Sequence, residues 1–361
     1  MKYLNEYRDL EATRTYLKRI EETVTRPWNI MEVCGGQTHG LIKNGIIDLL
    51  PEEVRMIHGP GCPVCVTPLK LIDKALALMD QGVIVCSFGD MIRVPGSEKS
   101  LLEAKAEGGD LRVLYSPLEA VKVAKENPDK EIVFFAVGFE TTAPANALSV
   151  LHAEKEGVSN YSILVSHVLV PPAMEAILDD EFCNIDAFLG AGNVCAIMGT
   201  SEYEELVKRH AVPVVVTGFE PLDLVQGIYM AVSQLEAGEA KVENQYSRIV
   251  KEEGNLAAKE VIRKVFEVAD RDWRGIGTIP NSGYVLREEY ARFDAEKKFG
   301  VGEISTAEHA SCIAGAILKG IKKPIQCSEF GKRCTPANPL GAPMVSSEGA
   351  CAAYYNFSET I

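Results

Sequence analysis

The sequence predicts an α/β protein with two Rossmann-like parallel-sheet domains, followed by a helical and irregular C-terminal domain. Three segments repeat one pattern, an apolar β-branched run that ends in small residues, a phenylalanine and an acidic group. They are residues 83–90 (VIVCSFGD), 132–140 (IVFFAVGFE) and 212–220 (VPVVVTGFE). Runs this apolar at consecutive positions are typical of strands that are buried on both faces, as in a parallel sheet.

Five shorter apolar runs are expected to supply further strands: residues 29–33, 54–57, 111–115, 162–165 and 186–189. Helices are expected between the strands, for example over residues 69–79 and 145–153. Strands that alternate with helices imply βαβ crossovers, so these eight runs predict two doubly wound sheets of about four strands each.

The polar segment 124–130 (AKENPDK), which Pro128 interrupts, is expected to join the two sheets. The predicted domains are a first α/β domain over 39–127, a second over 128–240, and a third formed by the terminal segments 1–38 and 241–361.

The C-terminal third of the chain has a different composition. Residues 242–299 are charged and expected to be largely helical, with one helix face formed by Val261, Ile262, Val265 and Phe266. From Lys323 onward the chain is rich in Pro, Gly, Ser and Cys, a composition of turns that an ordinary core would not hold together. A metal cluster is expected to organise this segment.

The composition excludes several classes of function. With 361 residues, 47% of them hydrophobic, the chain can bury a full core. A net charge of −14 argues against binding to nucleic acid or to an anionic membrane, so proteins or small molecules are the expected partners. The first residues carry charges where a signal peptide needs an apolar run, and no run approaches the ~20 apolar residues of a spanning helix. A cytoplasmic protein is expected.

Ten cysteines therefore need an explanation, because a reducing compartment seldom holds structural disulfides. Cys312, Cys327, Cys334 and Cys351 follow the spacing C-x14-C-x6-C-x16-C. Four thiolates are what a [4Fe-4S] cluster requires, although sulfur ligands also suit zinc. Cys86, Cys183 and Cys195 lie in or beside apolar runs and are expected to pack in the core.

Cys34 ends a predicted strand and precedes two glycines and a predicted helix, in the motif CGGQTH, which ends at His39. Ligands bind at this edge of open α/β sheets, and nearby backbone N–H groups favour a thiolate. Cys34 is thus a candidate iron ligand, with a core cysteine as the alternative.

A second motif, HGPGCPVC, contains His58, Cys62 and Cys65. A C-x-x-C pair before a helix in an α/β protein indicates a redox dithiol, and half of a zinc site is the alternative.

Together these motifs resemble the HypD family of hydrogenase maturation proteins. The resemblance includes the segments SEFGKRCTPANPLGAPMVSSEGAC, GFETTAPANA and SHVLVPPAM, and it extends over nearly the whole chain. It implies that Cys312, Cys327, Cys334 and Cys351 hold a [4Fe-4S] cluster, that Cys34 binds iron, and that Cys62 and Cys65 exchange electrons with the cluster. Proton-handling roles are implied for His39 and His58, and a structural role for either is equally open; Glu348 is expected to have a proton-handling or supporting role.

The family resemblance further implies a scaffold that works with the small chaperone HypC. On it a transient Fe(CN)2CO unit of nickel-iron hydrogenases is assembled, with cyanide supplied through HypE and HypF. Two other functions stay open: a stand-alone iron-sulfur thiol/disulfide oxidoreductase, and an interaction protein whose C-terminal segment is held by zinc. No P-loop is present, and Cys195 replaces the third glycine of a dinucleotide fingerprint, although a weaker nucleotide site is not excluded.

Overall fold

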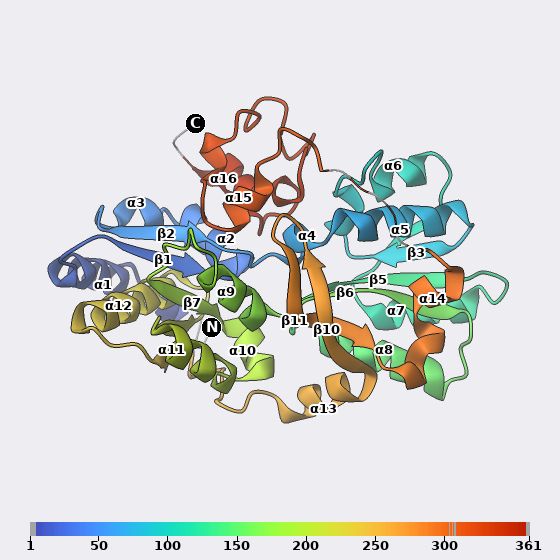
Figure 1. Cartoon of the computed structure of the whole chain (residues 1–361), viewed down its shortest axis with the longest axis horizontal. Helices are drawn as coiled ribbons and strands as arrows, with labels where there is room; N and C mark the ends of the chain where they lie inside the picture. The colour runs from blue at the N-terminus through green and yellow to red at the C-terminus, as the bar shows by residue number, and fades with distance from the viewer. Residues whose placement is uncertain (1–4, 303, 305, 307, 359–361) are drawn as a thin grey trace.

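All eight predicted strands form, and they lie in two parallel sheets, which confirms the fold class. The structure is a computed structural model that describes residues 5–302, 304, 306 and 308–358. Sheet A has the spatial order β2 (Val54–His58), β1 (Trp28–Glu32), β7 (Ala187–Ala191), β8 (Val214–Thr217) and β9 (Val242–Asn244). Sheet B has the order β4 (Leu111–Val113), β3 (Ile84–Ser87), β5 (Ile132–Gly138) and β6 (Tyr161–His167). The two sheets lie side by side in Figure 1.

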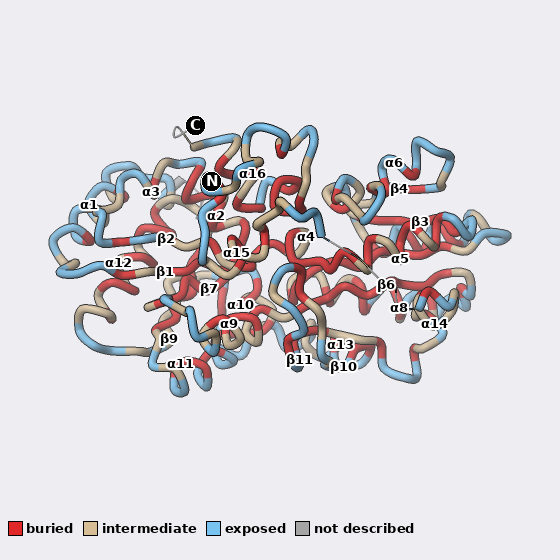
Figure 2. Tube along the Cα trace, turned by 45° about the horizontal axis from the view of Figure 1, so that its top comes forward, coloured by how far each residue is buried: buried red, intermediate tan, exposed pale blue. Residues whose placement is uncertain are grey.

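Apolar cores cover both faces of each sheet, which explains why the strands are apolar at consecutive positions. In β7, Leu189 packs into the core on one face of sheet A and Phe188 into the core on the other. In β5, Phe134 and Phe135 divide in the same way between the two cores of sheet B. The strands consequently run through the buried interior in Figure 2.

Helices pack against both faces of each sheet and supply the remaining residues of these cores. Those of the sheet A half are α1 (Leu10–Thr23), α2 (Gly35–Lys43), α3 (Ile46–Leu49), α9 (Val170–Leu178), α10 (Gly192–Met198), α11 (Glu204–His210) and α12 (Pro221–Ala237). Those of the sheet B half are α4 (Pro63–Val66), α5 (Leu69–Asp80), α6 (Leu101–Ala106), α7 (Pro117–Glu126) and α8 (Ala143–Lys155). Among the described residues no helix combines the length and the apolar character needed to cross a membrane.

The sheets do not follow the order of the chain. Sheet A begins with β1 and β2, the chain then builds all of sheet B, and it returns to sheet A at β7. The boundary expected at residues 127 and 128 falls inside sheet B, because β4 and β5 both pair with β3. Segment 124–130 therefore connects two strands of one sheet rather than two domains.

Residues 242–299 are less helical than expected. Helix α13 (Leu256–Val265) begins at the N-cap Asn255, whose side chain accepts a hydrogen bond from the Ala258 N–H. Phe266, expected on the same helix face, instead begins β10 (Phe266–Trp273), which pairs with β11 (Gly277–Leu286) in an antiparallel hairpin. This hairpin lies between the two sheets in Figure 1, and it is followed by the short helix α14 (Ala295–Phe299).

The cysteine-rich segment has little regular structure, as its composition predicts. From Cys312 to Ser358, the span that holds the four C-terminal cysteines, the α-helices are α15 (Ala314–Leu318) and α16 (Ala350–Phe357), both short. Within the described residues there are also six 3-10 helices: Asn5–Arg8 (η1), Met91–Arg93 (η2), Ser201–Tyr203 (η3), Glu288–Phe293 (η4), Pro324–Gln326 (η5) and Ala342–Met344 (η6). Figure 1 shows the segment resting on the sheet A half, above α2 and α4. It therefore covers the ends of β1 and β2.

Truncation of a buried ring in sheet A is expected to destabilise the protein strongly. Phe188 on β7 is fully buried, so Phe188→Ala is expected to lower the free energy of unfolding by about 3–5 kcal/mol. Phe182 is 72% exposed, so Phe182→Ala is expected to change it by less than about 0.5 kcal/mol. Urea titration followed by circular dichroism measures both. Equal losses in the two variants would contradict the packing described for sheet A.

Candidate thiol and metal site

Cys34 lies where the strand connections of sheet A diverge. It is the N-cap of α2, directly after β1. From β1 the chain goes to β2 on one side, whereas from β7 it goes to β8 on the other, so the ends of β1 and β7 form a switch point. Asn193 follows β7, and its Oδ1 lies 3.6 Å from the Cys34 Sγ. The thiol thus occupies the position at which open α/β sheets bind ligands.

Two glycines allow other segments to approach Cys34 closely. A Cβ atom on Gly61 would lie 2.2 Å from the backbone nitrogen of Cys34, and one on Gly35 would lie 2.4 Å from the Glu348 Cβ. The Gly35 N–H also donates to the Gly61 carbonyl, at 2.8 Å. Because no side chain intervenes, the loop with the C-x-x-C motif and the C-terminal segment both pack against Cys34.

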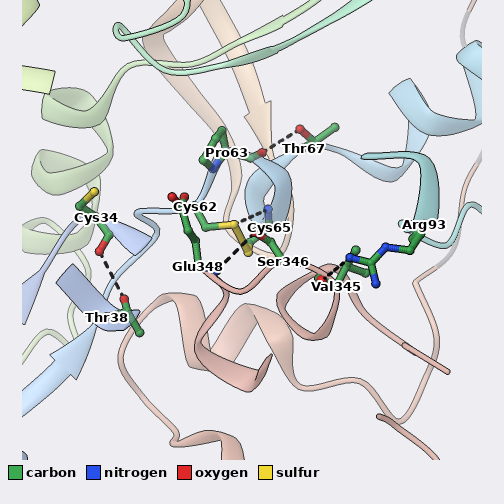
Figure 3. The surroundings of a disulfide bond; sticks show 10 residues. All are labelled: Cys34, Thr38, Cys62, Pro63, Cys65, Thr67, Arg93, Val345, Ser346 and Glu348. Atoms are coloured by element: carbon green, nitrogen blue, oxygen red, sulfur yellow. Dashed lines mark hydrogen bonds between the residues drawn. A yellow bond between two sulfur atoms is a disulfide. The ribbon is translucent and has the colours of Figure 1, made fainter. Parts of the chain in front are cut away.

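Cys62 and Cys65 form a disulfide at the start of α4. Both residues are buried, at 3% and 1% exposure, and the Cys65 N–H donates to the Cys62 Sγ at 3.2 Å. The pair lies on the connection that leaves sheet A for sheet B. Figure 3 shows the disulfide, Cys34 and Glu348 gathered in one region.

The Cys34 thiol is less acidic than its position at a helix start suggested. Burial raises the pKa of Cys34 to about 12, and the Glu348 carboxylate contributes to the increase. The backbone N–H groups of Gly36 and Gln37 lower the pKa but do not outweigh burial. For Cys34, burial therefore has a larger effect than the helix start, which the sequence suggested would favour a thiolate.

His58 belongs to a buried hydrogen-bonded network around Glu32. Its Nδ1 lies 2.6 Å from the Glu32 Oε1, and its Nε2 lies 3.2 Å from the hydroxyl of Tyr354 on α16. The same carboxylate accepts hydrogen bonds from the Thr38 hydroxyl at 2.5 Å and from the Cys34 N–H at 3.3 Å. Burial raises the pKa of Glu32, and the interaction with His58 partly opposes this increase. The network links the backbone of Cys34 to the C-terminal helix.

His39 and Gln37, both on α2, lie outside the hydrogen-bonded network around Glu32 and contact other segments. The His39 Nδ1 lies 3.2 Å from the Ser347 carbonyl, and the ring contacts Phe357 edge to face. His39 therefore holds the C-terminal segment on α2. The Gln37 amide donates to the Gly190 carbonyl at 3.0 Å and to the Thr217 hydroxyl at 2.7 Å, so it joins α2 to β7 and β8.

The four C-terminal cysteines lie in one neighbourhood. Burial raises the pKa of Cys351, and the nearby sulfurs of Cys312, Cys334 and Cys327 raise it further. The Leu340 N–H donates to the Cys334 Sγ at 3.4 Å, an arrangement that stabilises a sulfur carrying negative charge. In the described part of the chain, no group of three or more His, Cys, Asp or Glu side chains is arranged to hold a metal ion. The donor set of four thiols with a backbone N–H donor is chemically suited to an iron-sulfur cluster.

Sequence reasoning missed Glu32, Asn193 and Tyr354. The sequence could have indicated Glu32, because an acidic residue inside an apolar strand needs hydrogen-bond partners when it is buried. Asn193 and Tyr354 had none, since their roles depend on β7 and α16 packing beside Cys34 and His58. Cys86 and Cys195 are buried as predicted, and Cys183 is partly exposed.

Comparison with known proteins gave consistent matches. Residues 11–358 match the model of the HypD family, described as "Hydrogenase formation hypA family". The chain is 47% identical over 368 residues to the hydrogenase maturation factor HypD2 of Bradyrhizobium diazoefficiens, covering 99% of this chain and 97% of that protein. It is 47% identical over 367 residues to the hydrogenase maturation factor HypD of Azotobacter vinelandii, with 99% and 97% covered. The hydrogenase expression/formation protein HupD of Azotobacter chroococcum matches at 47% over 367 residues, with 99% and 97% covered.

Removal of the Glu348 charge is expected to make Cys34 more acidic. The carboxylate raises the Cys34 pKa, so Glu348→Gln should lower it. The inflection in the rate of Cys34 alkylation by iodoacetamide, followed by mass spectrometry, should move to lower pH, with a roughly threefold to tenfold faster rate at pH 8. Glu329→Gln is the control, because Glu329 acts on Cys334. An unchanged inflection in Glu348→Gln would contradict the proximity of the two groups.

Proposed function

The chain belongs to the HypD family of hydrogenase maturation factors, and we propose that it is a scaffold for assembly of the Fe(CN)2CO unit of nickel-iron hydrogenases. Family membership confirms the resemblance seen in the sequence. The observation that carries the finer proposal is the position of Cys34, a single thiol at the switch point of sheet A with a disulfide and a carboxylate beside it. HypC is the proposed partner that shares the iron, and HypE with HypF the proposed source of cyanide. The proposed location is the cytoplasm.

Cys34 is the proposed ligand of the incoming iron. A thiol must lose its proton to bind a metal, and a raised pKa means that this loss is coupled to binding. Burial and the Asp90 charge raise the pKa of Glu348. The Glu348 carboxylate is the proposed acceptor of the Cys34 proton, because it is the charged group with the largest electrostatic effect on Cys34. Glu32 and Asn193 hold the backbone and sulfur of Cys34 in place.

Cys62 and Cys65 are the proposed redox pair. Reduction of their disulfide takes up two electrons and two protons, and oxidation of the dithiol releases them. Cys312, Cys327, Cys334 and Cys351 would hold a [4Fe-4S] cluster, which supplies one-electron transfer when bound. Glu348 lies three residues from Cys351 and packs against Gly35, so the C-terminal segment brings the two thiol regions together.

The stand-alone thiol/disulfide oxidoreductase is the second candidate. It requires a disulfide that an external dithiol can reach. Cys62 and Cys65 are 3% and 1% exposed, which favours exchange with a group inside the protein. The scaffold is therefore the better supported function.

The metal content of the purified protein tests the cluster. Anaerobic purification should yield a brown protein with about four iron and four sulfide per chain. Cys327→Ala should lose this iron, because a cluster ligand is removed, whereas Cys183→Ala should retain it. A colourless protein with one zinc per chain would rule out the cluster.

Infrared spectroscopy of the protein purified with its partners tests the role of Cys34. Cyanide and carbonyl stretches should be present in the native chain and in Cys183→Ala, and absent in Cys34→Ala. Cys34→Ala should keep its cluster iron and sulfide. If the cluster were lost in that variant, or if the stretches persisted, Cys34 would not be the ligand proposed.

A further inference from the structure

A groove runs along the outer strand of sheet A. Strand β2 is at the edge of the sheet, and β1 is its one pairing strand there. A cavity of about 330 Å³ is lined by the consecutive residues Arg55, Met56, Ile57 and His58 of this strand. Its opposite wall comes from residues within 317–326, between α15 and the first residues before Cys327. Asn29 of β1 and Asn184 also line the cavity, so it extends from the edge strand β2 onto the neighbouring face of sheet A.

The edge of β2 offers unused backbone groups to the groove. The Gly59 N–H donates to the Glu32 carbonyl, so odd-numbered residues direct their backbone groups toward β1. Met56 and His58 must then direct theirs away from β1. No backbone hydrogen bond from another segment of the described chain reaches either residue. An edge of this kind can pair with a further strand.

The side chains around the groove are apolar and cationic. Ile321 and Ile325 are 54% and 46% exposed on the opposite wall. Arg55, Lys322 and Lys323 line the same groove and are exposed. Among the described residues none of these three cations forms an ion pair, although the nearby Lys319 pairs with Asp180. These three cations concentrate positive charge at the groove in a chain of net charge −14.

We propose that this groove binds an extended acidic segment of a partner protein, which adds to sheet A as a strand beside β2. The backbone of the segment would pair with Met56 and His58, its apolar side chains would pack on Ile321 and Ile325, and its carboxylates would pair with the three cations. The proposal depends on the groove alone and not on the iron chemistry.

The position of the groove gives such a partner access to both thiol regions. Strand β2 leads directly into the loop with Cys62, and the opposite wall leads directly into Cys327. A segment bound between them contacts the two elements that carry the disulfide and one candidate cluster ligand.

A synthetic peptide tests the proposal on the full chain. The probe is a fluorescein-labelled hexapeptide of alternating glutamate and valine, and fluorescence polarisation measures its binding. Saturable binding is expected, weaker at higher salt because the cations are exposed. The double variant Lys322→Glu with Lys323→Glu should bind roughly tenfold more weakly or worse. The matched control is Lys18→Glu with Lys208→Glu, two lysines that are 74% and 79% exposed elsewhere.

A second peptide, N-methylated at alternate positions, separates strand pairing from charge attraction. It keeps the carboxylates but cannot donate its backbone hydrogen bonds, so it should bind weakly to the unmodified chain. Equal binding of both peptides, no saturable binding, or equal losses in the two double variants would overturn the proposal. If the chain forms dimers that the Lys322→Glu, Lys323→Glu variant dissociates, the occupant is a second copy and the proposed separate partner is wrong.

Discussion

Strands β1 and β7 pair in parallel through residues 30–32 and 187–189, although the whole of sheet B lies between them in the chain. This pairing creates the switch point at which Cys34 meets Asn193. It also forces the chain to cross between the sheets twice, and the outward crossing carries Cys62 and Cys65. The approach of Asn193 to Cys34 depends on this long-range pairing, whereas the disulfide loop reaches Cys34 because it follows β2, which pairs directly with β1.

Close backbone contacts around Cys34 bury its thiol and so raise its pKa. Gly61 and Gly35 have no side chains, so the disulfide loop and Glu348 exclude water from Cys34. The result is a thiol whose pKa is raised by burial and by a nearby carboxylate. A protonated and buried sulfur resists oxidation, so the same contacts protect the Cys34 thiol.

The sequence was sufficient for elements whose signal is local. Eight strands could be located because burial on both faces leaves runs such as 132–138 without polar residues. The allocation of strands to sheets could not be predicted, since the pairing of β1 with β7 has no local signal. The β10–β11 hairpin was missed because β10 mixes charged and apolar residues in a way that a helical pattern also allows, and because Pro280 and two glycines interrupt the apolar pattern of β11. Cys34 follows β1 and precedes α2 as the sequence predicts, whereas its pKa depends on Glu348 and on burial, which only the tertiary structure supplies.

The double crossing also fixes an order in which parts of the protein can form during synthesis. Sheet B is contiguous in the chain, from β3 to β6, so it can close as soon as residue 167 has left the ribosome. Sheet A must wait for β7, β8 and β9, and until then β1 and β2 have no partner on the β7 side. The C-terminal segment emerges last and covers Cys34 only afterwards. The enclosed environment of Cys34 therefore exists only once the C-terminal segment has been made, and in a prematurely terminated chain this thiol stays uncovered.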